Sequence, residues 1–182
     1  KQFRVAQMQM ERYRNHDADV DDYFDTESLA KFIALSDVIN GNHGSIWHNQ
    51  RNYFNPVTNK LEPIAYDCFM APNLLTTKAT MEGLDRKRKK YFTLIEATLG
   101  NKEVEEKYYE YVKKFSNKKY LEEAFKTLAK DIAKAEKLLN YEYPNIQLDK
   151  EFFRNNAKQI REQLNEYGAH RKNLNEEVDT FR

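Results

Sequence analysis

The sequence is poor in the residues that build disulfide-rich, metal-caged or loop-rich proteins. It contains one cysteine, Cys68, which excludes an internal disulfide framework and a cage of several cysteines around zinc. Glycine occurs 5 times and proline 4 times, so strong chain breakers are rare. Each glycine or proline is therefore a useful marker of where an element ends.

An excess of one charge and a long apolar run are also missing. The 30 basic and 29 acidic side chains leave a net charge of +1, so composition gives no general reason to expect a nucleic-acid or membrane partner. No apolar run approaches the ~20 residues of a membrane-spanning helix, and no transmembrane segment is expected in this chain. No signal peptide is visible and the chain begins with Lys1, which leaves the compartment open.

The remaining composition is that of a folded protein. Hydrophobic residues make up 40% of the 182 positions and aromatic residues 13%, enough for one domain with a core. We expect a single domain over 1–182, mainly α with one small β-hairpin, with a helical subdomain at 84–166. Apolar periodicity predicts helices at about 27–40, 86–99, 102–115, 118–140 and 150–166, and residues 1–15 read as a short helix or an irregular entry.

Two helix starts carry clear capping signals. Asp25 or Thr26 is expected to cap the helix at 27–40, because a side-chain oxygen there accepts a hydrogen bond from a free backbone N–H of the first turn. Gly41 is expected to end that helix. Asp149 is expected to cap the last helix in the same way.

The predicted helix at 118–140 has one apolar stripe with alternating steps of four and three residues. The stripe comprises Leu121, Phe125, Leu128, Ile132, Ala135 and Leu139. We expect this helix and the last one to pack through their stripes, with Leu128 and Phe153 buried. On that basis Leu128→Ala should cost about 2–5 kcal/mol.

The segment 37–67 differs from the rest in its concentration of His, Asn and aromatic residues. A polar loop leaves a helix, and short strands are expected at 51–54 and 61–66 around an Asn-Pro turn. Kinase-type enzymes build a metal site in this way, from a loop Asn and an Asp at a later strand end. Asn49 and Asp67 are the natural pair, although each residue type is also common in simple turns.

The run LAKFIALSDVINGNHGSIWHNQRNYF, starting at Leu29, and the following LEPIAYD carry a family resemblance. They resemble the catalytic loop and metal-binding Asp of the CotH family of atypical, spore-coat-type kinases. The stretch EVEEKYYEYVKKFSNKKYLEEAF resembles the C-terminal helices of that family, so the likeness covers about residues 23–165. It implies the C-lobe of an atypical protein-kinase-like α+β fold with the N-lobe absent.

The resemblance assigns roles residue by residue. Asn49 and Asp67 stand at the two metal-binding positions. The catalytic Asp is expected five residues before the Asn, and this chain has Gly44 there. His43, which adjoins that position, and Asp37 are the candidates to replace the missing catalytic carboxylate, with His43 preferred.

The resemblance further implies Mg²⁺ and ATP as cofactors of the intact protein, and Ser/Thr on surface or extracellular proteins as substrates. It favours a cell-surface or extracytoplasmic location. Arg51 is a candidate phosphate contact in the nucleotide site, and a cross-strand partnership with Glu62 is the plainer interpretation.

Two readings of the enzyme remain open. Gly44 cannot accept a proton, so the chain is either an active kinase that uses a neighbouring residue or an inactive, partner-binding pseudokinase. In the first case Gly44→Asp should preserve or raise activity. The chain has no Gly-rich phosphate loop and too little sequence before residue 23 for an N-lobe, so we expect it to be inactive alone.

Other features have ordinary interpretations. Cys68, beside Asp67, is more typical of a packing residue than of a nucleophile. The spacing of His43 and His48 gives little support for a zinc site that includes either residue. The basic run at 86–90 is typical of a solvated helix face.

Overall fold

A computed structural model of the chain describes residues 2–15, 19–45, 49–68 and 98–180, with side chains as far as residue 165. The chain divides into two compact units, residues 1–112 and 113–182. The helical subdomain expected at 84–166 extends across this boundary. The basic run at 86–90 lies outside the described residues. So does nearly all of the helix predicted at 86–99, of which residues 98–99 are described and helical.

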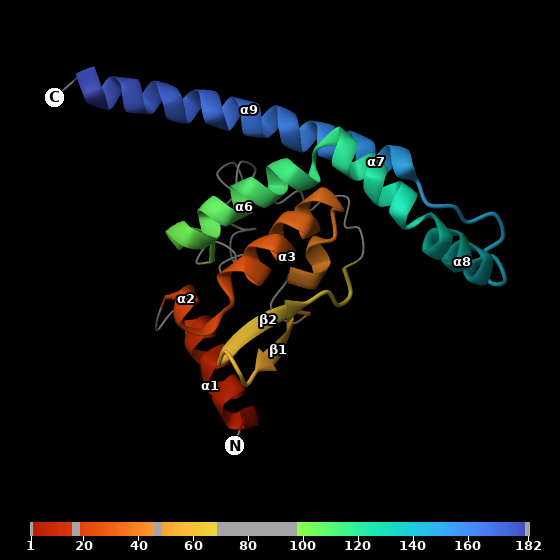
Figure 1. The fold of residues 1–182 in the computed structure, drawn as a ribbon, viewed down its shortest axis with the longest axis horizontal. Coiled ribbons are helices and arrows are strands. Elements are labelled where there is room, and N and C mark those ends of the chain that lie inside the picture. The colour runs from red at the N-terminus through yellow and green to blue at the C-terminus, as the bar shows by residue number, and fades with distance from the viewer. Residues whose placement is uncertain (1, 16–18, 46–48, 69–97, 181–182) are drawn as a thin grey trace. The chain divides into compact units, whose positions relative to one another are not determined.

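The first unit combines short helices with one β-hairpin, as the sequence predicts. In Figure 1 the hairpin lies along α3, and α3 contacts β2. The elements are α1 (Gln2–Asn15), α2 (Val20–Tyr23), α3 (Thr26–Val38), the 3₁₀ turn η1 (Asn42–Ser45), β1 (Arg51–Asn55), β2 (Lys60–Ile64) and α6 (Lys102–Phe115), whose last turn passes into the second unit.

Helix α3 is bounded by strong local signals. Asp25 is its N-cap, and its Oδ1 accepts a hydrogen bond from the Ser28 backbone N–H (2.7 Å), which confirms the predicted start. At the other end Asn40 has a positive φ of 54°, and the Gly41 N–H donates to the Ser36 carbonyl (2.7 Å). The left-handed residue that ends the helix is therefore Asn40, one position before the predicted Gly41.

The hairpin is antiparallel and places Arg51 opposite Ile64 and Asn55 opposite Lys60. Its turn is stabilised by the Asn55 side chain, which accepts a hydrogen bond from the Val57 backbone N–H (3.0 Å). The buried Leu61 anchors β2 in the core beside Phe24, with which it forms an isolated parallel bridge. Around it, the buried rings of Tyr13, Tyr23 and Phe24 pack edge to face.

In the second unit the predicted helix at 118–140 is two helices, α7 (Lys118–Thr127) and α8 (Ala129–Leu139). Leu128 interrupts them with φ −86° and ψ 3°, and its side chain is 49% exposed. The prediction that Leu128 is buried is wrong, because a break in the helix turns the residues after it away from the stripe that precedes it.

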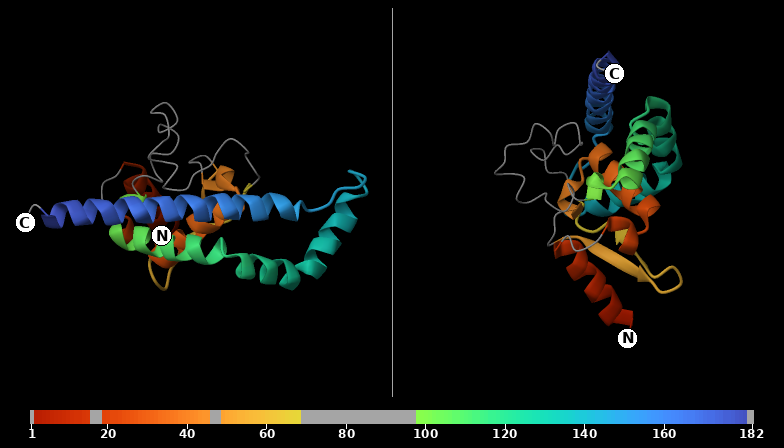
Figure 2. Two further views of the ribbon diagram at one scale, coloured as in Figure 1. Left: turned by 90° about the horizontal axis from the view of Figure 1, so that it is seen from above. Right: turned by 90° about the vertical axis from the view of Figure 1, so that its left-hand side faces the viewer.

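Helix α9 (Lys150–Thr180) begins where Asp149 predicts, since Asp149 Oδ1 accepts a hydrogen bond from the Phe152 N–H (3.0 Å). It continues well past the predicted end at 166, as one uninterrupted helix (Figure 2). Its first turns contact α7: Arg154 makes a bidentate pair with Glu122, through Nε to Oε1 (2.7 Å) and Nη2 to Oε2 (2.9 Å). Across the described residues, no helix combines the length and apolarity needed to cross a membrane.

Candidate functional site

The candidate site lies at the open end of the hairpin. The left-handed turn after α3 leads directly into η1, which carries His43. Asn49 precedes β1 by two positions, and Asp67 follows β2 by three, with a positive φ of 51°. Because β1 and β2 are paired, the residues just outside their open end are held near each other and near η1.

The structure brings His43, Asn49 and Asp67 together. His43 Nδ1 lies 2.7 Å from Asn49 Nδ2 and 3.2 Å from Asp67 Oδ2. The Asn49 amide and the Asp67 carboxylate therefore contact the same nitrogen. It follows that Asn49 Nδ2 and Asp67 Oδ2 are at most about 6 Å apart. His43 Nδ1 also lies 3.3 Å from the backbone carbonyl oxygen of Asp67. The imidazole thus stands between the two residues that the sequence paired.

These three side chains differ in their access to solvent. The side chains of Asp67 and His43 are 44% and 23% exposed, whereas Asn49 is only 8% exposed. The Asn49 side chain is therefore buried, whereas the Asp67 carboxylate is open to solvent. Its Nδ2 also donates to the His43 carbonyl (3.2 Å), which ties the amide to the loop. Coordination of a cation requires that the amide turns to present Oδ1 instead.

Asp37 does not lie at this open surface. Its side chain is 3% exposed in the core of the first unit, where Oδ2 accepts a hydrogen bond from the Tyr108 hydroxyl (2.6 Å). A catalytic base must reach a substrate hydroxyl, and a buried carboxylate held by a buried tyrosine does not. The geometry favours a structural role for Asp37 as the partner of Tyr108, which the sequence did not reveal because the two residues are 71 positions apart.

Arg51 is exposed and stacks its guanidinium over the Tyr66 ring, 4.8 Å from the ring centroid. The suggested cross-strand partnership with Glu62 is wrong, because Glu62 lies opposite Tyr53 and accepts a hydrogen bond from Asn55 (2.8 Å). Arg51 also lines a groove of about 600 Å³ between α1 and β1. It therefore borders a hollow surface beside the hairpin.

Gly44 is buried, and its lack of a side chain is a steric requirement. A Cβ at this position would lie 2.3 Å from Cys68 Sγ and 2.6 Å from the Tyr66 carbonyl oxygen. The second of these atoms belongs to the backbone and cannot rotate away. These contacts argue against the expectation that Gly44→Asp preserves or raises activity, since the space for an aspartate side chain is already filled.

The Cys68 thiol has the features of a packing residue. It donates weakly to the Tyr66 carbonyl (3.5 Å), and burial raises its pKa, which disfavours the reactive thiolate. In the part of the chain that the structure describes, no three His, Cys, Asp or Glu residues gather as a metal cage. The Trp47 and His48 positions lie outside that part.

Comparisons of the chain with models of protein families, with curated proteins and with solved structures find no match.

Proposed function

We propose that this chain is the metal-binding lobe of a CotH-like atypical kinase. In the intact protein it would transfer a phosphoryl group from ATP, with Mg²⁺, to Ser or Thr hydroxyls of surface or extracellular proteins. The observation that supports this is the convergence of His43, Asn49 and Asp67 at the open end of the hairpin. The family resemblance of the segment 37–67 supplies the reaction and the substrate class.

The donor chemistry suits a hard cation. Asp67 offers an exposed carboxylate and Asn49 an amide oxygen, which are the ligand types that Mg²⁺ accepts, with water and phosphate oxygens at the other positions. Bound Mg²⁺ neutralises charge on the phosphates. Within the proposal, Asp67 is the principal ligand, Asn49 the second, His43 accepts the proton of the substrate hydroxyl, and Arg51 contacts phosphate from the adjacent strand.

A catalytically inactive, CotH-like module that binds a partner is the second candidate. Two observations favour it. The position of the expected catalytic Asp is Gly44, whose surroundings exclude a side chain, and the other candidate carboxylate, Asp37, is buried. Such a module would keep the fold and the metal pair, and bind nucleotide without turning it over.

Metal-dependent nucleotide binding tests what both candidates share. Isothermal titration of the 182-residue chain with ATP should give weak binding that requires Mg²⁺, and Asp67→Ala should remove the Mg²⁺-dependent part, since the main carboxylate ligand is lost. Glu62→Gln is the matched control, because it neutralises a carboxylate of the same hairpin yet keeps an acceptor for Asn55. ATP binding that is equal with and without Mg²⁺, or unchanged in Asp67→Ala, would exclude the proposed site.

A further inference from the structure

Strand β1 pairs with β2 along one edge, and its other edge carries backbone hydrogen-bonding groups. The far side of β2 is occupied, because the Asp25 N–H donates to the Leu61 carbonyl (3.0 Å). That carbonyl points away from β1, so Leu61 and Phe54 form a non-hydrogen-bonded pair of the antiparallel ladder. Pro63, which has no N–H to donate, lies opposite Asn52 and fits the same register. The backbone groups of Asn52 and Phe54 therefore point away from β2.

A groove follows this outer edge of β1. Within the described residues the sheet has two strands, and a groove of about 600 Å³ separates β1 from α1. Its lining includes Phe3, Ala6 and Met10, which share one face of α1, and Asn52, Tyr53 and Phe54 of β1. Because successive strand residues point to opposite faces, a lining that contains all three means that the groove runs along the edge of the strand. Its volume is within the range of ligand-binding sites.

The lining is uncharged apart from one residue. Large apolar side chains remain open to solvent there, with Phe3 79% and Tyr53 54% exposed. Arg51 is the one charged residue among the described residues of the lining. Its guanidinium lies over the Tyr66 ring, and its Nη1 donates to the Gln50 carbonyl (3.0 Å). The planar guanidinium has further N–H donors in the geometry that suits a carboxylate, so an acidic group complements the charge of the groove.

We propose that this groove binds an extended, acidic peptide segment of a partner protein, which pairs with β1 as a third strand. The peptide main chain exchanges hydrogen bonds with Asn52 and Phe54, its alternate apolar side chains contact the groove, and an acidic residue pairs with Arg51. A main chain suits the edge because it offers donors and acceptors with the spacing of a strand. Such binding requires neither the metal pair Asn49 and Asp67 nor nucleotide. It therefore goes beyond both candidate functions and is independent of them.

A phage-displayed library of random eight-residue peptides, selected on the full 182-residue chain without Mg²⁺ or ATP, supplies the probe. Selected peptides should carry apolar residues at alternate positions and an acidic residue near one end. Fluorescence anisotropy of synthetic copies should give a Kd below about 100 μM. Methylation of successive backbone nitrogens of the peptide should weaken binding at least about fivefold at every second position, because only alternate N–H groups face β1.

Variants of the chain test the backbone contact and the charge separately. Asn52→Pro and Asn52→Ala both remove the side-chain amide, but only proline removes the outward N–H, at a position that an edge strand tolerates. Binding should be at least about fivefold weaker in Asn52→Pro than in Asn52→Ala. Arg51→Gln should weaken binding about two- to fivefold and reduce its dependence on salt. Arg12→Gln is the control, because Arg12 is exposed on α1 outside the groove lining.

Circular dichroism checks that each variant is folded, and Phe54→Pro against Phe54→Ala repeats the comparison if Asn52→Pro is not. Strand pairing would be refuted by methylation effects without a two-residue alternation, or by equal binding in a folded proline variant and its alanine control. Unchanged binding in Arg51→Gln would refute the acidic contact. No selected peptide with a Kd below about 100 μM would overturn the proposal as a whole. So would a micromolar dimer of the parent, measured by analytical ultracentrifugation and lost in the proline variant, because a second copy would then occupy the edge.

Discussion

Gly44 shows at the scale of one residue how packing can decide which side chain a position can hold. We predict that Gly44→Ala destabilises the first unit by about 1–3 kcal/mol, because the new methyl group overlaps Cys68 Sγ and the Tyr66 carbonyl. Urea unfolding measures this. Gly100→Ala is the control, since a Cβ there meets nothing within 4 Å, and it should leave stability unchanged or raise it by up to about 1 kcal/mol. Equal stability of Gly44→Ala and the parent would contradict the close approach.

The site residues differ in how far the sequence could identify them. Asn49 and Asp67 were paired from the hairpin between them and from the family resemblance, and His43 from its position next to Gly44. The sequence could not reveal that Gly44 is crowded, because the crowding atoms belong to residues beyond the hairpin. It likewise suggested Asp37 as a base, since only the tertiary fold brings Tyr108 to it.

At the scale of elements, the break between α7 and α8 reverses one expectation about stability. Leu121 is 8% exposed and Leu128 is 49% exposed, although both belong to the same sequence stripe. We predict that Leu121→Ala costs about 2–5 kcal/mol through lost burial. Leu128→Ala should cost less than about 1 kcal/mol, as for most exposed positions. Urea unfolding followed by circular dichroism compares the two, and a larger loss in Leu128→Ala would contradict the observed burial.

Elements with local signals were the ones that the sequence predicted well. The caps at Asp25 and Asp149 act through the next three residues, and the hairpin is defined by its Asn-Pro turn, so both are visible in a short window. The apolar stripe at 118–140 is equally local. The spacing of its apolar residues continues through Leu128, however, and does not reveal that the helical backbone is interrupted there. The short helix α2 and its aromatic contacts depend on tertiary packing and gave no such pattern.

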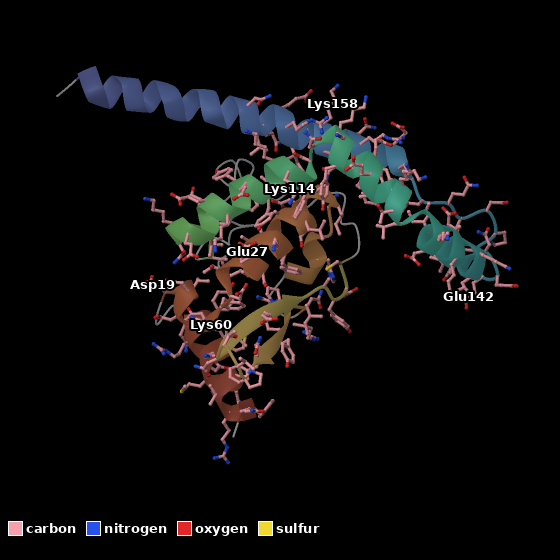
Figure 3. All side chains as sticks on the ribbon, in the orientation of Figure 1. Asp19, Glu27, Lys60, Lys114, Glu142 and Lys158 are labelled. Atoms are coloured by element: carbon pink, nitrogen blue, oxygen red, sulfur yellow. The ribbon has the colours of Figure 1, made fainter. Side chains whose placement is uncertain are left out.

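The contact between α3 and α6 should make stability depend on acid pH. Lys31 and the Tyr111 hydroxyl donate to the Glu27 carboxylate, which lowers its pKa from 4.5 to about 2 (Glu27 is labelled in Figure 3). A pKa that is lower in the folded state stabilises the fold above about pH 4.5, and this contribution is lost as pH falls towards 2. Because Glu27 is at the surface, solvent and salt weaken the effect.

We therefore predict that Glu27→Gln reduces the fall in melting temperature between pH 6 and pH 2 relative to the parent, as measured by circular dichroism. The reason is that the variant has no carboxylate to protonate over this range. Glu142→Gln, at an exposed position after α8, is the control and should follow the parent (Figure 3). The same pH response in Glu27→Gln and the parent would show that this network contributes nothing measurable. High salt should shrink the difference between them.

Over the whole molecule, every residue proposed for chemistry lies in the first unit, residues 1–112. The 70 residues of the second unit contribute helices whose described contacts are packing and ion pairs, such as Arg154 with Glu122. The phosphate-binding lysine and Gly-rich loop of kinases have no counterpart motif in the sequence. Under the proposed function, the chain would supply only the half of the phosphoryl-transfer site that binds the metal.

From this division we predict that residues 1–182 alone show no detectable phosphoryl transfer, because kinase catalysis depends on positioning and charge neutralisation from both halves of the site.

In the intact protein, Asp67→Ala should lower turnover of labelled ATP by at least about 10²-fold, since the main metal carboxylate is lost. His43→Ala should lower it far more than His48→Ala. Gly44→Asp should lower activity together with stability, because its side chain has no room. Full activity in Asp67→Ala would exclude the kinase proposal, and an intact protein that binds Mg²⁺–ATP without turnover would identify the inactive module.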